Sequence, residues 1–190
     1  MWHKRLMLVW VVSLMLALQP VVSSAQVGDA FVVKSANTHL DGNIFFLNAV
    51  FDVQLPFYIT DAIAQGFNLP VLMEIEVFKS KSFWFDEQIV YIKQQYLVNN
   101  HPLLDAVSVL NMNSGRRQYF STLVEAVQHI SALLDFPMLD QNNLPDDQDY
   151  DARIRLGVDQ SQIPIPLKSS SFWKNNWDLK SEWYEWELKP

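Results

Sequence analysis

The sequence predicts a mainly β protein, an antiparallel sheet or sandwich of about eight strands with two short helices, at the border with the α+β class. Apolar and polar residues alternate in several short segments, as in half-buried strands. Turns rich in Gly, Asn and Asp join most of these segments, whereas repeating βα units are absent. The 190 residues are 49% hydrophobic, which is too apolar for a disordered chain.

The first two strands are expected as a hairpin within residues 27–55. Asp41-Gly42-Asn43 lies between two apolar segments, and its glycine permits the positive φ that tight turns need. After the turn, alternate positions of residues 45–55 are apolar, so they share one face of the second strand. Pro56 ends this strand, and a short helix is expected over residues 58–65.

Four further strands are expected in the middle of the chain, over residues 69–78, 88–98, 104–112 and 118–120. In the first of them Met73, Ile75 and Val77 face one side, while Glu74 and Glu76 face the other. Polar residues predict tight reversals of the chain at 99–102 and 113–115.

A second helix is expected to begin at Thr122. Thr122 and Glu125 have the spacing of a capping box, in which each side chain bonds an exposed backbone amide near the other residue. The apolar residues Leu123, Val127, Ile130 and Leu134 recur at helical spacing and indicate one buried stripe. Phe136-Pro137 is expected to end this helix.

The last strands are expected near the C-terminus. Residues 150–159 alternate strictly, with Ile154 and Leu156 inward and Arg153 and Arg155 outward. Two prolines make residues 163–167 an extended edge segment, and residues 183–188 form a final strand. We see no internal repeat and no low-complexity linker, so residues 26–190 are expected to form a single β-rich domain.

The first 25 residues have the three parts of a secretory signal peptide. Lys4 and Arg5 precede an apolar run over residues 6–18. Ser23 and Ala25 are small, as cleavage requires, and the cut is expected between Ala25 and Gln26. An uncleaved membrane anchor is the alternative, but a spanning helix needs about 20 apolar residues, and Gln19-Pro20 interrupts this run earlier. We therefore expect export to the periplasm.

Charge and cysteine content exclude several classes. Cleavage removes two cationic residues and no acidic one, so the net charge falls from −7 to −9. An acidic protein is repelled by nucleic acids and anionic lipids, so we expect neither as a partner, and no membrane insertion after cleavage. The chain contains no cysteine. A disulfide, a thiolate metal site, a cysteine nucleophile and a lipoprotein anchor are thereby excluded.

The sequence offers no catalytic constellation, so we expect no enzyme, no cofactor and no metal. The three histidines after the signal, His39, His101 and His129, lie in separate segments without metal-ligand spacing. Asp147, Asp149 and Asp151 have the spacing of the start of a calcium loop. However, Ala152 replaces the required glycine, and Val158 stands at the position of the closing glutamate. A spatial pair of hydrolytic carboxylates stays open, because sequence spacing does not reveal one.

Tryptophans are concentrated near the C-terminus, at Trp173, Trp177, Trp183 and Trp186. They could form a stacking platform for sugar rings or for a hydrophobic partner, but we favour the alternative that they complete the core, because aromatic residues dominate core energetics. In a strand, Trp183 and Trp186 point to opposite faces because their separation is odd. We therefore expect one of these faces to pack inward, while the other can remain exposed.

Several motifs together resemble a known family. They are Asp61-Ala62-Ile63-Ala64-Gln65-Gly66, Leu69-Pro70, Phe83-Trp84-Phe85-Asp86, Arg153 to Leu156, Asp159 to Pro164, and Trp177 to Trp186. This arrangement resembles the proteobacterial exported family called domain of unknown function 4390, with Lys180 as a departure from the C-terminal pattern. The resemblance covers almost all of residues 27–188. It implies an exported protein without catalytic residues to transfer, and the proximity of some family genes to a sensor kinase hints at envelope signalling.

These observations favour a non-catalytic binding or protein-interaction module of the cell envelope, with an unidentified envelope protein as its partner. The alternative is binding of a glycan, such as peptidoglycan, through Trp173, Trp177, Trp183 and Trp186. Open indoles beside a groove would favour the glycan, and four buried indoles would contradict it. An unrecognised carboxylate hydrolase ranks last.

Overall fold

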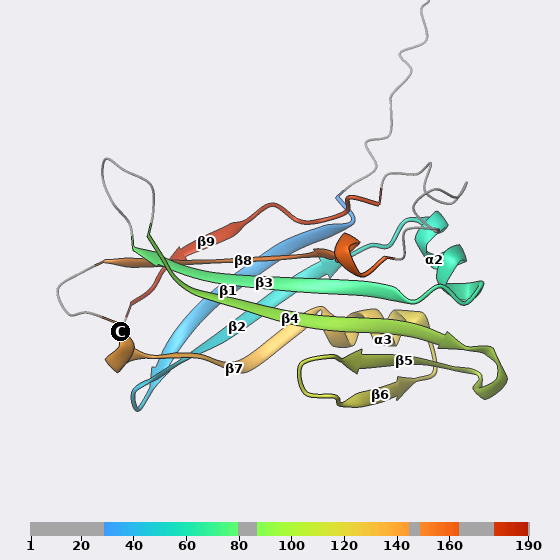
Figure 1. Ribbon diagram of the computed structural model, residues 1–190, viewed down its shortest axis with the longest axis horizontal. Coiled ribbons are helices and arrows are strands. Elements are labelled where there is room, and N and C mark those ends of the chain that lie inside the picture. The colour runs from blue at the N-terminus through green and yellow to red at the C-terminus, as the bar shows by residue number, and fades with distance from the viewer. Residues whose placement is uncertain (1–28, 80–86, 145–148, 164–176, 190) are drawn as a thin grey trace, which may run out of the picture.

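The computed structural model (Figure 1) describes residues 29–79, 87–144, 149–163 and 177–189. These residues form nine strands in two antiparallel sheets with two α-helices, which confirms the predicted fold class. The larger sheet has the strand order β6-β5-β4-β3-β8-β9, and the smaller has the order β1-β2-β7. No helix within these ranges is long and apolar enough to cross a lipid bilayer.

The smaller sheet consists of β1 (Phe31–Asp41), β2 (Ile44–Val53) and β7 (Ala132–Asp140). The predicted hairpin of β1 and β2 is confirmed, and Gly42 in its turn has a φ of 59°. One face of β2 is almost completely buried, because alternating apolar residues point to the same side: Phe45, Leu47, Ala49 and Phe51. This face forms one side of the core.

The larger sheet forms the other side of the core. Its strands are β3 (Leu69–Lys79), β4 (Glu87–His101), β5 (Ala106–Asn111), β6 (Arg117–Phe120), β8 (Tyr150–Val158) and β9 (Tyr184–Glu187). Alternating apolar residues of β3 and β8, including Met73, Ile75, Ile154 and Leu156, are buried against the smaller sheet. In Figure 1, β1 and β2 cross the long strands at an angle, as in packed sheets whose strands twist.

Two short helices pack against the larger sheet. Helix α2 (Phe57–Ala64) buries Ile59, Ala62 and Ile63. Helix α3 (Leu123–Ile130) begins with the predicted cap, since Thr122 Oγ1 accepts a hydrogen bond from the Glu125 amide at 3.2 Å. The Glu125 carboxylate accepts from the Ser121 amide at 2.9 Å, one residue before the donor of an ideal capping box.

The predicted end of the second helix was wrong. Helix α3 ends at Ile130, and the Ser131 hydroxyl donates to the Val127 carbonyl oxygen at 2.8 Å. The next residues form strand β7, in which Leu134 is 69% exposed instead of buried in the predicted stripe. Proline is tolerated at position 137 because β7 is an edge strand that pairs only with β2.

The predicted reversal at residues 99–102 lies too early in the chain. Strand β4 continues through His101, and the chain turns in the 3₁₀ helix η1 (Pro102–Leu104) and at Asp105, whose φ is 46°. Further 3₁₀ turns, η2 (Gln141–Asn143) and η3 (Gln160–Gln162), flank β8. The predicted signal peptide, most of the segment 163–167, Trp173 and Asp147 lie outside the described residues.

Candidate functional site

The structure separates the C-terminal tryptophans that it describes. Trp177 is only 3% exposed and contacts the rings of Phe67 and Tyr58 edge-on, with centroid distances of 4.9 and 6.0 Å. Trp186 is half-buried, and its Nε1 donates to Thr38 Oγ1 at 3.3 Å, which joins β9 to β1 of the other sheet. These two indoles therefore belong to the core and do not share a stacking platform with Trp183.

Trp183 is half-buried on the outer face of the larger sheet. Its ring covers the guanidinium groups of Arg155 and Arg153, at 4.2 and 4.7 Å from the ring centroid. Trp186 lies on the inner face, because it pairs with the buried Ala152. The two tryptophans thus occupy opposite faces, as their odd separation predicts. Trp183 is the one described tryptophan that could contact a ligand on this face.

The charges beneath Trp183 are already paired. The register of β3 and β8 places Glu74 opposite Arg155 and Glu76 opposite Arg153, and both pairs have N–O distances of 2.6 Å. The Tyr91 hydroxyl also donates to Glu74. Burial alone would raise the pKa of Glu74, but the hydrogen bonds from Arg155 and Tyr91 and the positive charge of Arg155 outweigh it and lower the pKa. This face is an internally satisfied ion-pair network.

A serine–histidine pair occurs on the same outer face. The His101 Nε2 and Ser108 Oγ atoms are 2.8 Å apart, and Arg117 donates to the same Oγ at 3.1 Å. Sequence reasoning missed this pair, because only the pairing of β4 with β5 brings the two residues together. Ser108 has 0% exposure, so a substrate cannot reach its hydroxyl. The trio therefore fits a structural role better than nucleophilic catalysis.

A hollow of about 770 Å³ opens on the inner face of β4, β5 and β6. Helix α3 and strand β7 form its other wall, and we call it the inter-sheet cleft. It is lined by Gln94, Tyr96, Val109, Asn111, Asn113, Ser114, Arg116, Gln118, His129, Ala132, Leu133, Leu134, Phe136 and Pro137. Its volume is within the range of about 300–1,000 Å³ that is usual for small-molecule sites.

Strand pairing brings the polar residues of the cleft together. Tyr96 lies opposite Asn111, and Val109 lies opposite Gln118, so all four share the inner face of the sheet. The turn beyond β5 is held in place by Asn113, whose Nδ2 donates to the Lys93 carbonyl oxygen at 2.9 Å and whose Oδ1 accepts from the Gln95 amide at 2.8 Å. The Asn113 side chain in the polar wall is therefore held in place.

Gln118 contributes an unsatisfied acceptor to the cleft. Its Oε1 atom is buried, and no donor in the described residues bonds to it. Such an atom costs about 1–3 kcal/mol if it stays unpaired, and buried polar atoms without partners are rare in folded proteins. Unlike the fully buried Ser108, the Gln118 side chain is only half-buried and lines the cleft, so rotation of its terminal amide brings Oε1 to a ligand hydroxyl, which would remove this cost.

The opposite wall is apolar and aromatic. It includes Phe136 and Leu133 of β7, with His129 of α3 beside them. Burial lowers the pKa of the His129 imidazole, and the ring lies 5.2 Å from the Phe120 ring between centroids. Burial also raises the pKa of the Tyr96 hydroxyl on the sheet side. The cleft therefore combines flat ring surfaces with amide groups.

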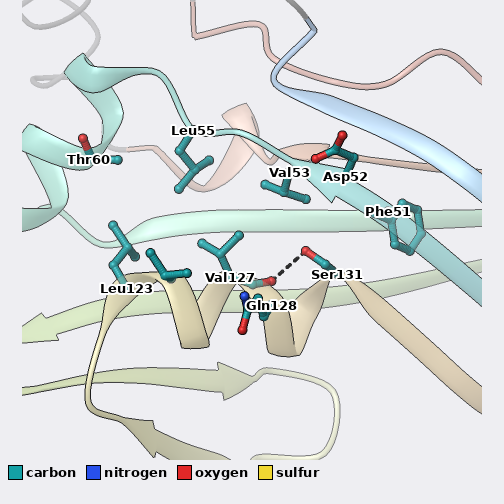
Figure 2. Close-up of a pocket in the computed structure, with 10 residues that line it drawn as sticks. Phe51, Asp52, Val53, Leu55, Thr60, Leu123, Val127, Gln128 and Ser131 are labelled. Carbon is teal, nitrogen blue, oxygen red and sulfur yellow. Dashed lines mark hydrogen bonds between the residues drawn. The ribbon is translucent and has the colours of Figure 1, made fainter.

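A second hollow of about 400 Å³ lies where the end of β2 approaches α2 and α3. Figure 2 shows Val53, Leu55 and Val127 around this space. Three of its polar residues, Asp52, Thr60 and Ser131, already have partners, which are Lys34, the Phe57 carbonyl oxygen and the Val127 carbonyl oxygen, and the fourth, Gln128, is exposed. In contrast to the inter-sheet cleft, no described residue that lines this hollow has a buried side-chain N or O atom without a hydrogen-bond partner.

The family model described as domain of unknown function (DUF4390) matches residues 28–187, which include every strand of both sheets and the whole lining of the cleft. No curated protein and no solved structure matches the chain.

Proposed function

We propose a function for the chain on the premise that it belongs to the DUF4390 family: it is an exported, non-catalytic binding module of the cell envelope, and the inter-sheet cleft holds a small polar ligand. The signal-like residues 1–25 support export to the periplasm. The observation that carries the binding role is the unpaired Gln118 Oε1 atom inside the cleft.

The composition of the cleft supports ligand binding more than structural packing. Amide side chains donate and accept hydrogen bonds at the same time, which suits ligands with several hydroxyl groups. The rings of Tyr96 and Phe136 offer surface for the apolar face of a sugar ring. A few oriented polar groups among apolar walls are typical of small-molecule sites.

A non-catalytic role is supported by the state of the candidate reactive groups. The hydroxyl of Ser108 is completely buried beneath the outer face of the sheet. The only histidine in the cleft lining, His129, has an aromatic ring as its neighbour and lies beside no lining carboxylate. Binding alone requires only hydrogen-bonding groups and ring surfaces, which the cleft has, whereas catalysis would require further reactive groups.

Glycan binding at Trp183 is a second candidate. It is favoured by the partial exposure of Trp183 on an outer face whose arginines and glutamates are fixed in ion pairs. A sugar could stack on the free part of the indole. This candidate differs from the first in location, on the opposite face of the larger sheet.

Side-chain amide NMR distinguishes the two sites. Pools of neutral sugars, acidic sugars and amino acids at millimolar concentration are titrated into the isotopically labelled protein. We expect shifts of the Gln94 and Gln118 amide signals, while Asn48, whose side chain bonds Asp135 in the smaller sheet, serves as the control. Shifts confined to the Trp183 indole would favour the second candidate. If no signal of the cleft moves with any pool, the proposal is wrong.

A further inference from the structure

The charge of the inter-sheet cleft differs from that of the molecule. The chain has a net charge of −7, with 21 acidic residues, yet none of the described residues that line the cleft is Asp or Glu. The lining includes one arginine, Arg116, and one histidine, His129. Because burial favours the neutral form of His129, the lining carries one positive charge, that of Arg116, and no negative one, which attracts anions.

Arg116 differs from the other arginines of the described residues. Arg153 and Arg155 pair with Glu76 and Glu74, and Arg117 donates to Ser108. The guanidinium of Arg116 makes no ion pair or side-chain hydrogen bond within the described ranges. Because a guanidinium binds carboxylates in a two-pronged geometry, this group is available to an anionic ligand.

We propose that the ligand of the inter-sheet cleft is an acidic sugar, a polyhydroxylated ring that carries a carboxylate. This inference rests on the proposed binding function and specifies its ligand. The carboxylate pairs with Arg116, one hydroxyl donates to the Oε1 atom of Gln118, and the apolar face of the ring packs on Tyr96 or Phe136.

The carboxylate and the hydroxyl groups of this ligand bind different residues of the cleft. A simple carboxylate would satisfy Arg116 but would leave Gln118 Oε1 unpaired, because an ionised carboxylate only accepts hydrogen bonds. A neutral sugar would satisfy Gln118 but would leave the guanidinium without a counter-charge. Only a ligand with both groups pairs with Arg116 and Gln118 together.

Isothermal titration calorimetry with three probes tests the inference. The probes are D-glucuronate, D-glucose and acetate, each titrated into the purified protein at low salt, where exposed charges are least screened. We expect glucuronate to bind about tenfold more tightly than glucose or acetate, a ratio that corresponds to one favourable charged contact.

Adjacent arginines provide a matched pair of variants. Arg116→Gln should remove the preference for glucuronate over glucose, whereas Arg117→Gln should retain it, because Arg117 bonds Ser108 on the other face. Arg116→Lys keeps the charge and should retain part of the preference. Thermal unfolding of each variant verifies that its fold is intact.

The outcomes separate this inference from the function on which it rests. If glucose binds in the cleft as tightly as glucuronate, the ligand is not acidic, but the binding function stands. If the preference disappears equally in Arg117→Gln, it depends on the loss of any positive charge in this region and not on the contact with Arg116, and the inference is overturned. If neither sugar binds and the NMR pools leave the cleft unchanged, the binding function itself is wrong.

Discussion

At the scale of single residues, the ion pair of Glu74 and Arg155 makes stability depend on pH. The folded state lowers the pKa of Glu74 below its ordinary value of 4.5, so the carboxylate stabilises the fold above that pH. This contribution is lost as the pH falls through the lowered pKa, because the unfolded chain binds the proton more readily. Glu74→Gln should therefore flatten the decline of the unfolding temperature below about pH 4.5. Glu182→Gln, at an exposed residue, is the control and should leave the decline unchanged.

His129 should make stability depend on pH in the same direction as Glu74, but within a higher pH window. Burial lowers its pKa from 6.5, so the folded state prefers the neutral imidazole. Stability is complete above about pH 6.5 and decreases as the pH falls, because the unfolded chain takes up the proton first. His129→Gln should reduce the difference in unfolding temperature between the two sides of this pH. An equal reduction in His39→Gln would show that the effect is not local to His129.

Gly157 is required by a close contact and not by its backbone angles. A Cβ atom at this position would lie 2.6 Å from the Lys180 Cβ and 2.7 Å from the Leu179 carbonyl oxygen. Gly157→Ala should therefore displace the segment before β9 and cost about 1–3 kcal/mol. Hydrogen exchange at the Val158 amide, which donates to Leu179, should accelerate. Gly42→Ala strains only its own turn and should leave this amide unaffected; equal acceleration in both variants would contradict the account.

At the residue scale, the sequence predicted the face of the sheet to which a side chain points better than it predicted the contacts of that side chain. Alternation correctly placed Arg153 and Arg155 opposite the buried Ile154. The odd separation of Trp183 and Trp186 correctly placed them on opposite faces. However, spacing alone could not predict that Trp177 would enter the core or that Ser108 would meet His101, because both depend on contacts between distant segments.

At the scale of elements, the contribution of the N-cap of α3 to the free energy of unfolding can be measured directly. Thr122→Ala removes the acceptor for the Glu125 amide and should lower the free energy of unfolding by about 0.5–2 kcal/mol. Thr122→Ser retains a hydroxyl and should be close to the wild type in denaturant unfolding. If both variants lose the same free energy, the threonine methyl group and not the cap is responsible.

Strand β7 shows why the sequence alone did not predict where helix α3 ends. The helical spacing of Leu123, Val127 and Ile130 continues to Leu134, so it predicts too long a helix. Pairing with β2 outweighs this local preference, and Asn48 fixes the strand by accepting from the Asp135 amide at 2.9 Å. Asp135 has a φ of 47°, a conformation that apolar periodicity does not reveal.

At the scale of the whole molecule, the cleft results from the unequal width of the two sheets. The larger sheet has six strands and the smaller has three, and α3 with β7 faces the inner side of β4, β5 and β6. Figure 1 shows α3 and β7 beside this part of the larger sheet. The lining residues come from four strands, a turn and a helix, so no local pattern in the sequence could have identified the site.

A binding role for Gln118 predicts that this residue lowers the stability of the fold instead of adding to it. Replacing an unpaired buried acceptor by an apolar group of similar size is neutral or stabilising, whereas a residue needed only for the fold would destabilise the protein when replaced. Asn99 provides the matched control, because its Oδ1 is the other buried acceptor without a partner among the described residues. It lies on the opposite face of the sheet from Gln118.

The most direct measurement therefore compares Gln118→Leu and Asn99→Leu with the wild type, by calorimetric titration of D-glucuronate and by thermal unfolding. We predict that neither variant unfolds at a lower temperature and that Gln118→Leu binds glucuronate about tenfold more weakly, while Asn99→Leu binds it as the wild type does. Unchanged glucuronate binding by Gln118→Leu, or equal loss of binding in both variants, would contradict the account.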